Sequence, residues 1–183
     1  MKAPDFKRKK QAGEKISMIT CYDYPSARLA ADTPIDCLLV GDSLAMTVHG
    51  HPATHHATLE MMTLHTQAVA RGLGPLFLIT DMPFLSYHGA ISHTLSHVQT
   101  LIQAGAHAVK LEGGNARICR TISHLTDAGI AIIGHLGLTP QALHQLGGYR
   151  VQGKQPADAN RLIAEAIALE KAGCLAIVLE CIP

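Results

Sequence analysis

The chain has 183 residues, of which 48% are hydrophobic and 16% charged, and its formal net charge is +1. This composition excludes a disordered segment, and the near-zero charge gives no electrostatic reason to expect nucleic acid as the main partner. No apolar run approaches the roughly 18 residues that span a bilayer, so no membrane partner is expected. The 5 cysteines lack Cys-x-x-Cys spacing, which favours free thiols in a reducing compartment. We therefore expect a cytoplasmic protein.

Short apolar runs alternate along the chain with longer segments of helical periodicity. The runs are nearly all apolar, which is typical of parallel strands covered on both faces. The predicted strands are Ser17–Thr20, Cys37–Val40, Leu76–Thr80, Ala108–Leu111, Ala131–Gly134 and Ala176–Leu179.

Helices are predicted between these strands. Apolar residues recur at spacings of three and four in two segments, which predicts helices over Ile91–Ala104 and Ala157–Ala172. Gly105 and Gly173 follow these helices directly and suit C-terminal caps. The dipeptide Thr139–Pro140 is typical of a helix start, with a capping residue followed by proline.

Repeated βα units predict an α/β protein with either a doubly wound sheet or a (β/α)₈ barrel. No Gly-x-Gly-x-x-Gly motif follows the first strand, and this motif is the usual sign of a doubly wound, dinucleotide-binding sheet. Its absence disfavours that alternative. The segment Gly41–Thr58 is rich in glycine, histidine and threonine, which indicates a functional loop. No repeat or linker divides the chain, and we expect a single domain over residues 1–183.

Polar or ionisable residues lie at or near the C-terminal end of every predicted strand. In a parallel barrel these strand ends converge on one face, where such enzymes place their active sites. One such residue is ordinary loop composition, whereas its recurrence at strand after strand favours a shared site. The residues in question are Tyr22, Asp23, Asp42, Ser43, Asp81, Lys110, Glu112, His135 and Glu180.

Three of these residues suit a metal ion. Asp42, Asp81 and Glu112 offer hard oxygen ligands without a flanking His or Cys pair, which favours Mg²⁺ over Zn²⁺. A 2-oxo acid can chelate such an ion, which would stabilise the enolate formed when the neighbouring carbon loses a proton. Lys110 would pair with the developing negative charge. Glu180 is a candidate general base, and a low-polarity pocket would raise its pKa.

The same residues also have structural interpretations. Asp42 can cap a loop, and Tyr22 and Asp23 can order the loop after the first strand. Lys110 lies in an apolar strand, where an unpaired ammonium group is costly to bury. Glu112 is two residues further along, on the same side of the strand, and would form an ion pair with it.

Around these residues the sequence resembles the ketopantoate hydroxymethyltransferase (3-methyl-2-oxobutanoate hydroxymethyltransferase) family. The resemblance runs in order over nearly the whole chain. The matching segments are Thr20–Tyr24, Val40–Leu44, Asp81–Phe84, Val109–Gly114, Gly134–Pro140, Gly147–Gly153 and Leu179–Pro183.

The resemblance implies a (β/α)₈ barrel that transfers a hydroxymethyl group from 5,10-methylenetetrahydrofolate to 3-methyl-2-oxobutanoate, giving 2-dehydropantoate in pantothenate biosynthesis. It implies Mg²⁺ bound by Asp42 and Asp81, with Glu112 as a further ligand or close to the ion. Glu180 would accept the proton. The family forms a cyclic homo-oligomer, so a homo-oligomer is expected. The residues that would contact the oxo acid or lie beside it are Asp42, Ser43, Asp81, Lys110 and His135.

The sequence departs from the family's pattern in two ways. Ala45 stands where the family usually has glycine, and His55 and His56 stand where it tends to have Leu-Pro, so we expect a restricted, altered loop backbone. The family continues past Leu179–Pro183 through two more strand–helix units, and such a barrel typically needs about 250 residues. We therefore expect only about six βα units, and hypothesise a truncated or partial barrel.

Two other functions stay open on the sequence alone. One is a Mg²⁺-dependent aldolase or lyase that acts on a 2-oxo acid and needs no folate. The other is an inactive fragment that keeps metal or ligand binding. Folate dependence of product formation distinguishes the first, and binding without turnover would identify the second.

Overall fold

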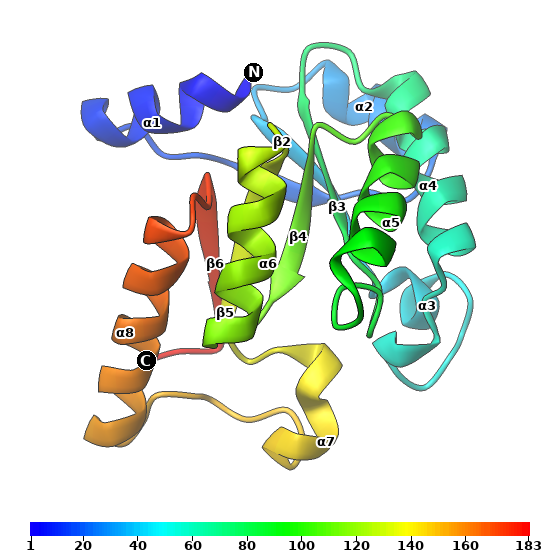
Figure 1. Ribbon diagram of the computed structural model, residues 1–183. Coiled ribbons are helices and arrows are strands. Elements are labelled where there is room, and N and C mark those ends of the chain that lie inside the picture. Colours follow the sequence, from blue (N-terminus) through cyan, green and yellow to red (C-terminus); the bar gives the residue numbers. More distant parts are fainter. The chain divides into compact units, whose positions relative to one another are not determined.

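The computed structural model describes all residues from Met1 to Pro183, and its backbone divides into two compact units, residues 1–109 and 110–183. Each unit has its own strands and covering helices (Figure 1). The boundary falls inside strand β4 (Ala108–Glu112), so each unit contains part of that strand. The expectation of one domain over residues 1–183 stays a prediction.

The strands of the first unit are β1 (Met18–Thr20), β2 (Cys37–Val40), β3 (Phe77–Asp81) and the first residues of β4. Neighbouring strands pair in parallel, and their order follows the chain. In the register between β2 and β3, Val40 lies opposite Thr80. Asp81, the last residue of β3, therefore lies beside the residues that follow β2, which include Asp42.

The helices of the first unit are α1 (Ala3–Ala12), α2 (Tyr24–Ala31), α3 (Leu44–Thr47), η1 (Thr54–His56), α4 (Leu59–Gly72) and α5 (Ile91–Gln103). Helix α4 packs between α2 and α5 and against β2 and β3 (Figure 1). It begins after Thr58, whose hydroxyl accepts a hydrogen bond from the Met61 backbone N–H at 3.2 Å. Met62, Thr66 and Val69 recur at helical spacing and form its buried face.

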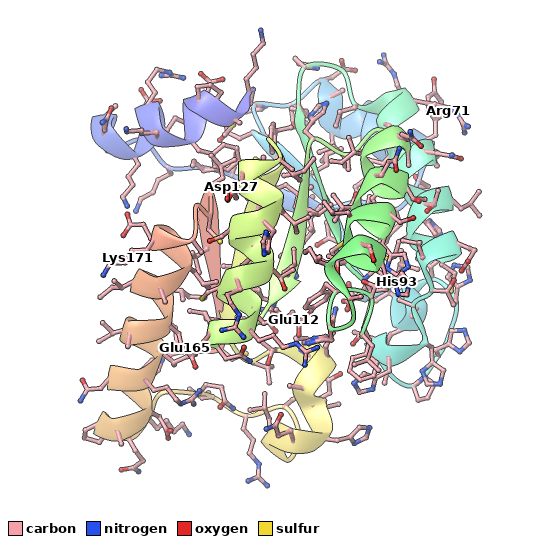
Figure 2. All side chains as sticks on the ribbon, viewed as in Figure 1. Arg71, His93, Glu112, Asp127, Glu165 and Lys171 are labelled. Atoms are coloured by element: carbon pink, nitrogen blue, oxygen red, sulfur yellow. The ribbon has the colours of Figure 1, made fainter.

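The elements of the second unit are the rest of β4, β5 (Ala131–Gly137), β6 (Ala176–Glu180), α6 (Ala116–Asp127), η2 (Pro140–Ala142), α7 (Leu143–Leu146) and α8 (Pro156–Lys171). Strands β5 and β6 pair in parallel, with Gly137 opposite Glu180. Helix α6 packs against α8, and α8 packs against β5 and β6. Figure 2 shows Glu112 at the opposite end of this unit from Asp127 and Lys171, which lie at the C-terminal ends of α6 and α8.

The predicted strands and the two long predicted helices are all present. Gly105 and Gly173 have φ angles of +113° and +98°, which confirms that both helices end in a left-handed residue. The start predicted at Thr139 is wrong in part, because η2 is a 3₁₀ turn and the Thr139 side chain makes no capping hydrogen bond.

The prediction that all strands are covered on both faces is wrong for the two outer strands. Every side chain of β1 is exposed, and those of β6 are half-buried or exposed. These strands stand first and last in the strand order, so each has a neighbour on one side only. Strands β3 and β4 are fully buried, as predicted.

The segment Gly41–Thr58 is partly helical, since it contains α3 and η1. Ala45 lies buried inside α3 and does not have a positive φ angle. A helical backbone accepts a methyl group without strain. The expectation that Ala45 restricts this loop is therefore wrong.

The architecture is α/β, with parallel strands in chain order and helices between them. This is the repeating unit of the (β/α)₈ barrel, and the chain holds six of its strands. The fold class predicted from the sequence is confirmed. None of the helices is both long and apolar enough to cross a bilayer.

Candidate functional site

The residues predicted for the site lie at strand ends and form one cluster in each unit. The aspartate cluster, in the first unit, consists of Asp42, Ser43 and Asp81. The His135 cluster, in the second unit, consists of Lys110, Glu112, His135 and Glu180.

The aspartate cluster is built on the parallel ends of β2 and β3. The Asp42 backbone N–H donates a hydrogen bond to Asp81 Oδ2 at 3.0 Å, and the two aspartates are only 4% and 3% exposed. Gly41 leaves room for the Ser43 hydroxyl group, because a Cβ at this residue would lie only 3.0 Å from Ser43 Oγ. Two buried aspartates thus meet at these strand ends, joined by a hydrogen bond from the backbone of one to the carboxylate of the other.

Buried carboxylates are costly unless they are hydrogen-bonded, paired or coordinated to a metal. Mg²⁺ usually takes one or two protein carboxylates and completes its shell with water and substrate oxygens. Asp42 and Asp81 fit that ligand set. No group of three or more His, Cys, Asp or Glu side chains is arranged to hold a metal ion, and Glu112 belongs to the other unit. Metal binding therefore stays a prediction.

Ser43 has a partner that the sequence did not reveal. The Tyr22 hydroxyl lies 2.8 Å from Ser43 Oγ, and the Tyr22 carbonyl lies 2.6 Å from Nδ1 of His65 in α4. From the sequence, Tyr22 was either one of the strand-end residues of a shared site or a residue that orders the loop, and His65 was missed. The available signal was a histidine set between the apolar residues Met62 and Val69 on one helix face.

Asp23 has the structural role considered from the sequence. Its carboxylate accepts a hydrogen bond from the Ser26 backbone N–H at 2.8 Å and caps α2. That backbone hydrogen bond lowers the pKa of Asp23 below its ordinary value. The side chain thus orders the loop after β1, as the structural interpretation predicted.

The His135 cluster centres on an imidazole that is only 2% exposed. His135 Nδ1 lies 3.3 Å from Glu112 Oε1 and 3.4 Å from Lys110 Nζ. His135 Nε2 lies 3.2 Å from Glu180 Oε2, within ion-pair distance although poorly aligned for a hydrogen bond. Glu112 also accepts a hydrogen bond from the Gln141 backbone N–H on its other oxygen, at 3.0 Å.

Lys110 and Glu112, proposed from the sequence as a pair, both approach the same nitrogen of His135. A protonated Nδ1 donates to the Glu112 carboxylate, whereas an unprotonated Nδ1 accepts from the Lys110 ammonium group. Whether Nδ1 of His135 carries a hydrogen therefore decides which of the two neighbours it bonds.

The charges around His135 shift two pKa values in opposite directions. Burial is the largest influence on His135 and lowers its pKa, but the carboxylates of Glu112 and Glu180 together raise that pKa above its ordinary value. The neighbouring His135 lowers the pKa of Glu180 and outweighs the effect of partial burial. The expectation that a low-polarity pocket raises the pKa of Glu180 is thus wrong.

The backbone around Glu180 is tightly constrained. Gly137 has a φ of +89°, and a Cβ at this residue would lie 2.1 Å from the Glu180 carbonyl oxygen. That oxygen accepts a hydrogen bond from the Leu138 N–H at 2.8 Å. The next residue, Cys181, has a φ of +47°, which is unfavourable for a residue with a side chain. Only glycine at position 137 allows this approach of β5 to Glu180.

In fold, the chain is similar to two solved enzymes. Phosphonopyruvate hydrolase, solved with oxalate and Mg²⁺, matches with a TM-score of 0.71 and 16% identity over 98% of this chain and 63% of that chain. The 2,3-dimethylmalate lyase, a member of the PEP mutase/isocitrate lyase superfamily, matches with a TM-score of 0.65 and 20% identity over 97% of this chain and 61% of that chain. At such low identity the likeness concerns the fold alone.

Sequence relatives are much closer. A 3-methyl-2-oxobutanoate hydroxymethyltransferase of Legionella pneumophila (strain Paris) is 62% identical over 183 residues, which are 100% of this chain and 70% of that protein. The protein of the same name from Coxiella burnetii (strain RSA 493 / Nine Mile phase I) is 52% identical over 183 residues, 100% of this chain and 69% of that protein. The profile of the ketopantoate hydroxymethyltransferase family matches residues 1–183. The resemblance found in the sequence is confirmed, and the chain belongs to the ketopantoate hydroxymethyltransferase family.

Proposed function

We propose that this protein transfers a hydroxymethyl group from 5,10-methylenetetrahydrofolate to 3-methyl-2-oxobutanoate. The observation that carries the proposal is 62% identity over all 183 residues to a relative named for that activity. The buried ionisable residues of both clusters support it. Burying such groups lowers the stability of the fold, so a role in binding or catalysis explains why they are there.

The reaction sets three tasks for the protein. The carbon next to the keto group loses its proton and forms a carbon–carbon bond to the one-carbon unit. That unit leaves the folate nitrogens, water supplies the hydroxyl group, and tetrahydrofolate and 2-dehydropantoate are the products. The protein must therefore bind an oxo acid anion, stabilise negative charge on its keto oxygen, and accept a proton.

Binding of the oxo acid is the role proposed for the aspartate cluster. Asp42 and Asp81 would hold Mg²⁺, which supplies positive charge for the carboxylate and keto oxygens of the oxo acid. The Ser43 hydroxyl would donate a hydrogen bond to the same anion. Burial of the two aspartates supports this role, since water competes weakly with a ligand there.

Proton transfer is the role proposed for the His135 cluster. The lowered pKa of Glu180 keeps its carboxylate ionised at neutral pH, which is the form that accepts a proton. His135 holds that carboxylate from one side, and Lys110 supplies positive charge for the developing enolate. Glu112 uses one oxygen toward His135 and the other toward the Gln141 N–H, which favours an orienting role over direct metal ligation.

The proposal is tested by folate dependence. The purified chain is incubated with Mg²⁺ and 3-methyl-2-oxobutanoate, with and without 5,10-methylenetetrahydrofolate, and 2-dehydropantoate is quantified by mass spectrometry. The expected result is product only with folate, and none from Glu180→Gln. Product from an oxo acid and an aldehyde without folate would instead identify an aldolase. Binding of the oxo acid by calorimetry without any turnover would identify an inactive protein and contradict the proposal.

A further inference from the structure

A chain of side-chain contacts leads from α4 to Ser43 within the first unit. His49 Nε2 lies 2.9 Å from His65 Nε2, and His65 Nδ1 lies 2.6 Å from the Tyr22 carbonyl oxygen. The Tyr22 hydroxyl lies 2.8 Å from Ser43 Oγ. The contacts thus link His49, His65 and Tyr22 to the hydroxyl group of Ser43, and the function proposed above uses neither histidine.

The chemistry of the partners fixes the direction of the two hydrogen bonds made by His65, whereas either hydroxyl can donate between Tyr22 and Ser43. A carbonyl oxygen only accepts, so His65 Nδ1 carries the hydrogen that it donates to Tyr22. In the neutral ring, Nε2 of His65 is then the acceptor, and His49 Nε2–H donates to it. The His49 contact therefore favours the one tautomer of His65 that can bind the Tyr22 backbone.

The position of His65 is set by packing. It is half-buried on α4, three residues after Met62 and four before Val69, both of which are fully buried. Residues at these spacings lie on one helix face, so the imidazole is held by a rigid element against the core side of the helix. Tyr22, by contrast, lies between β1 and α2 and has no regular structure of its own. The contact with His65 ties this loop residue to the helix.

Ser43 makes an unusual use of its hydroxyl group. It stands at the N-cap position of α3, where a serine side chain ordinarily accepts a hydrogen bond from the helix backbone. Ser43 has a φ of −55° and makes no such capping bond. Its oxygen is instead beside the Tyr22 hydroxyl. When Tyr22 donates, the hydrogen of Ser43 is left available for another acceptor.

We propose that His65 is a positioning residue for Ser43 and acts through Tyr22. By holding the Tyr22 backbone, His65 keeps the phenol hydroxyl on Ser43 Oγ and directs the Ser43 O–H toward a bound carboxylate. This inference rests on the proposed function, in which Ser43 binds the oxo acid anion. Loss of the relay weakens binding of the oxo acid and leaves the proton-transfer residues of the His135 cluster unchanged.

Two substitutions of the same residue separate its two contacts. In His65→Asn the amide nitrogen takes about the position of Nδ1, so the bond to the Tyr22 carbonyl is retained. In His65→Gln the amide lies about where Nε2 was, so that bond is lost. Tyr22→Phe removes only the hydroxyl next to Ser43. The matched control is His93→Gln, an exposed histidine of α5 labelled in Figure 2.

The first readout is the affinity for 3-methyl-2-oxobutanoate with Mg²⁺, measured by calorimetry, together with kcat and KM. Loss of one hydrogen bond to a bound anion corresponds to a change of about tenfold. We expect His65→Gln and Tyr22→Phe to weaken binding and raise KM by about that factor, with kcat within about twofold. His65→Asn and His93→Gln should bind like the unmodified protein.

The double variant Tyr22→Phe/His65→Gln should bind the oxo acid no more weakly than either single variant, because both substitutions break the same relay.

The second readout needs neither substrate nor turnover. Hydrogen–deuterium exchange over residues 41–48 should be faster in His65→Gln than in His65→Asn, with exchange in α5 as the internal standard for folding. Exchange over residues 41–48 that is the same in His65→Gln as in the unmodified protein would overturn the proposed relay. A fall in kcat at unchanged KM in His65→Gln would overturn it as well. If the protein fails to make 2-dehydropantoate but shows the exchange difference, the proposed function fails and the positioning of Ser43 stands.

Discussion

His135 Nε2 and Glu180 Oε2 lie 3.2 Å apart, and each group shifts the pKa of the other toward its charged form. The pair joins a buried imidazole on β5 to the carboxylate at the end of β6. Ionisation of the proposed proton acceptor is therefore set by a neighbouring side chain and not by burial alone.

Replacement of His135 should move the pH dependence of the reaction. Without the imidazole the pKa of Glu180 rises, because the neighbouring group that lowers it is gone while partial burial remains. The acid limb of the kcat–pH profile of His135→Gln should therefore shift to higher pH. The control is His124→Gln, on the exposed side of α6 in the same unit. An acid limb at the same pH in His135→Gln and the unmodified protein would show that His135 does not set the ionisation of Glu180.

The same pair predicts how stability depends on pH. The lowered pKa of Glu180 gives stability that is complete above the ordinary value of 4.5 and is lost as the pH falls through the folded-state pKa. The raised pKa of His135 gives stability that is complete below its ordinary value of 6.5 and is lost as the pH rises through the folded-state pKa. The difference in unfolding free energy between the unmodified protein and Glu180→Gln should be largest between these two pH values. Urea titrations in metal-free buffer measure it, and a difference that does not vary with pH would contradict the coupling.

Gly137→Ala should displace Glu180 as well as strain the backbone. A left-handed residue with a side chain costs on the order of 1–3 kcal/mol, and the new Cβ would also lie 2.1 Å from the Glu180 carbonyl oxygen. Gly148→Ala is the matched control, because Gly148 also has a positive φ of +109° but no atom within 4 Å of the added Cβ. We expect Gly137→Ala to lose more unfolding free energy than Gly148→Ala and to lose activity. Equal losses of stability would mean that the contact with Glu180 is unimportant.

Loss of either aspartate should weaken binding of the metal ion. Asp42→Asn and Asp81→Asn each replace a hard anionic ligand by a neutral amide, and we expect Mg²⁺ affinity to fall by about tenfold or more. Asp23→Asn is the control, since Asp23 caps α2 and has no predicted role in metal binding. Calorimetry with Mg²⁺ measures the affinities, and removal of the metal by a chelator should abolish turnover. Equal affinities in all three variants would place the metal elsewhere.

The strands and the strand-end residues could be predicted because their signals are local. Short apolar runs located β2 and β3. Asp81 is the last residue of β3, and Asp42 is the second residue after β2. The contact between Tyr22 and Ser43 could not be predicted in this way, since the two residues are 21 positions apart and meet only through the packing of their loops. Motif resemblance singled out Tyr22 as part of a matching segment and said nothing of its partner.

The direction of the Glu180 pKa shift could not be predicted either. From the sequence, the Glu180 carboxylate was expected to lie in a low-polarity pocket, where burial raises the pKa. The register of β5 and β6 places His135 opposite Val178, and its ring reaches the Glu180 carboxylate two residues on. His135, with a smaller contribution from Lys110, outweighs the effect of partial burial on the pKa of Glu180, and only the three-dimensional arrangement reveals these neighbours.

The central claim is hydroxymethyl transfer, and isotope transfer tests it most directly. The purified protein is given Mg²⁺, 3-methyl-2-oxobutanoate and 5,10-methylenetetrahydrofolate labelled with ¹³C in the methylene group. The account predicts that the label appears in the hydroxymethyl carbon of 2-dehydropantoate, as seen by ¹³C NMR. Unconsumed labelled folate, or 2-dehydropantoate without the label, would contradict it.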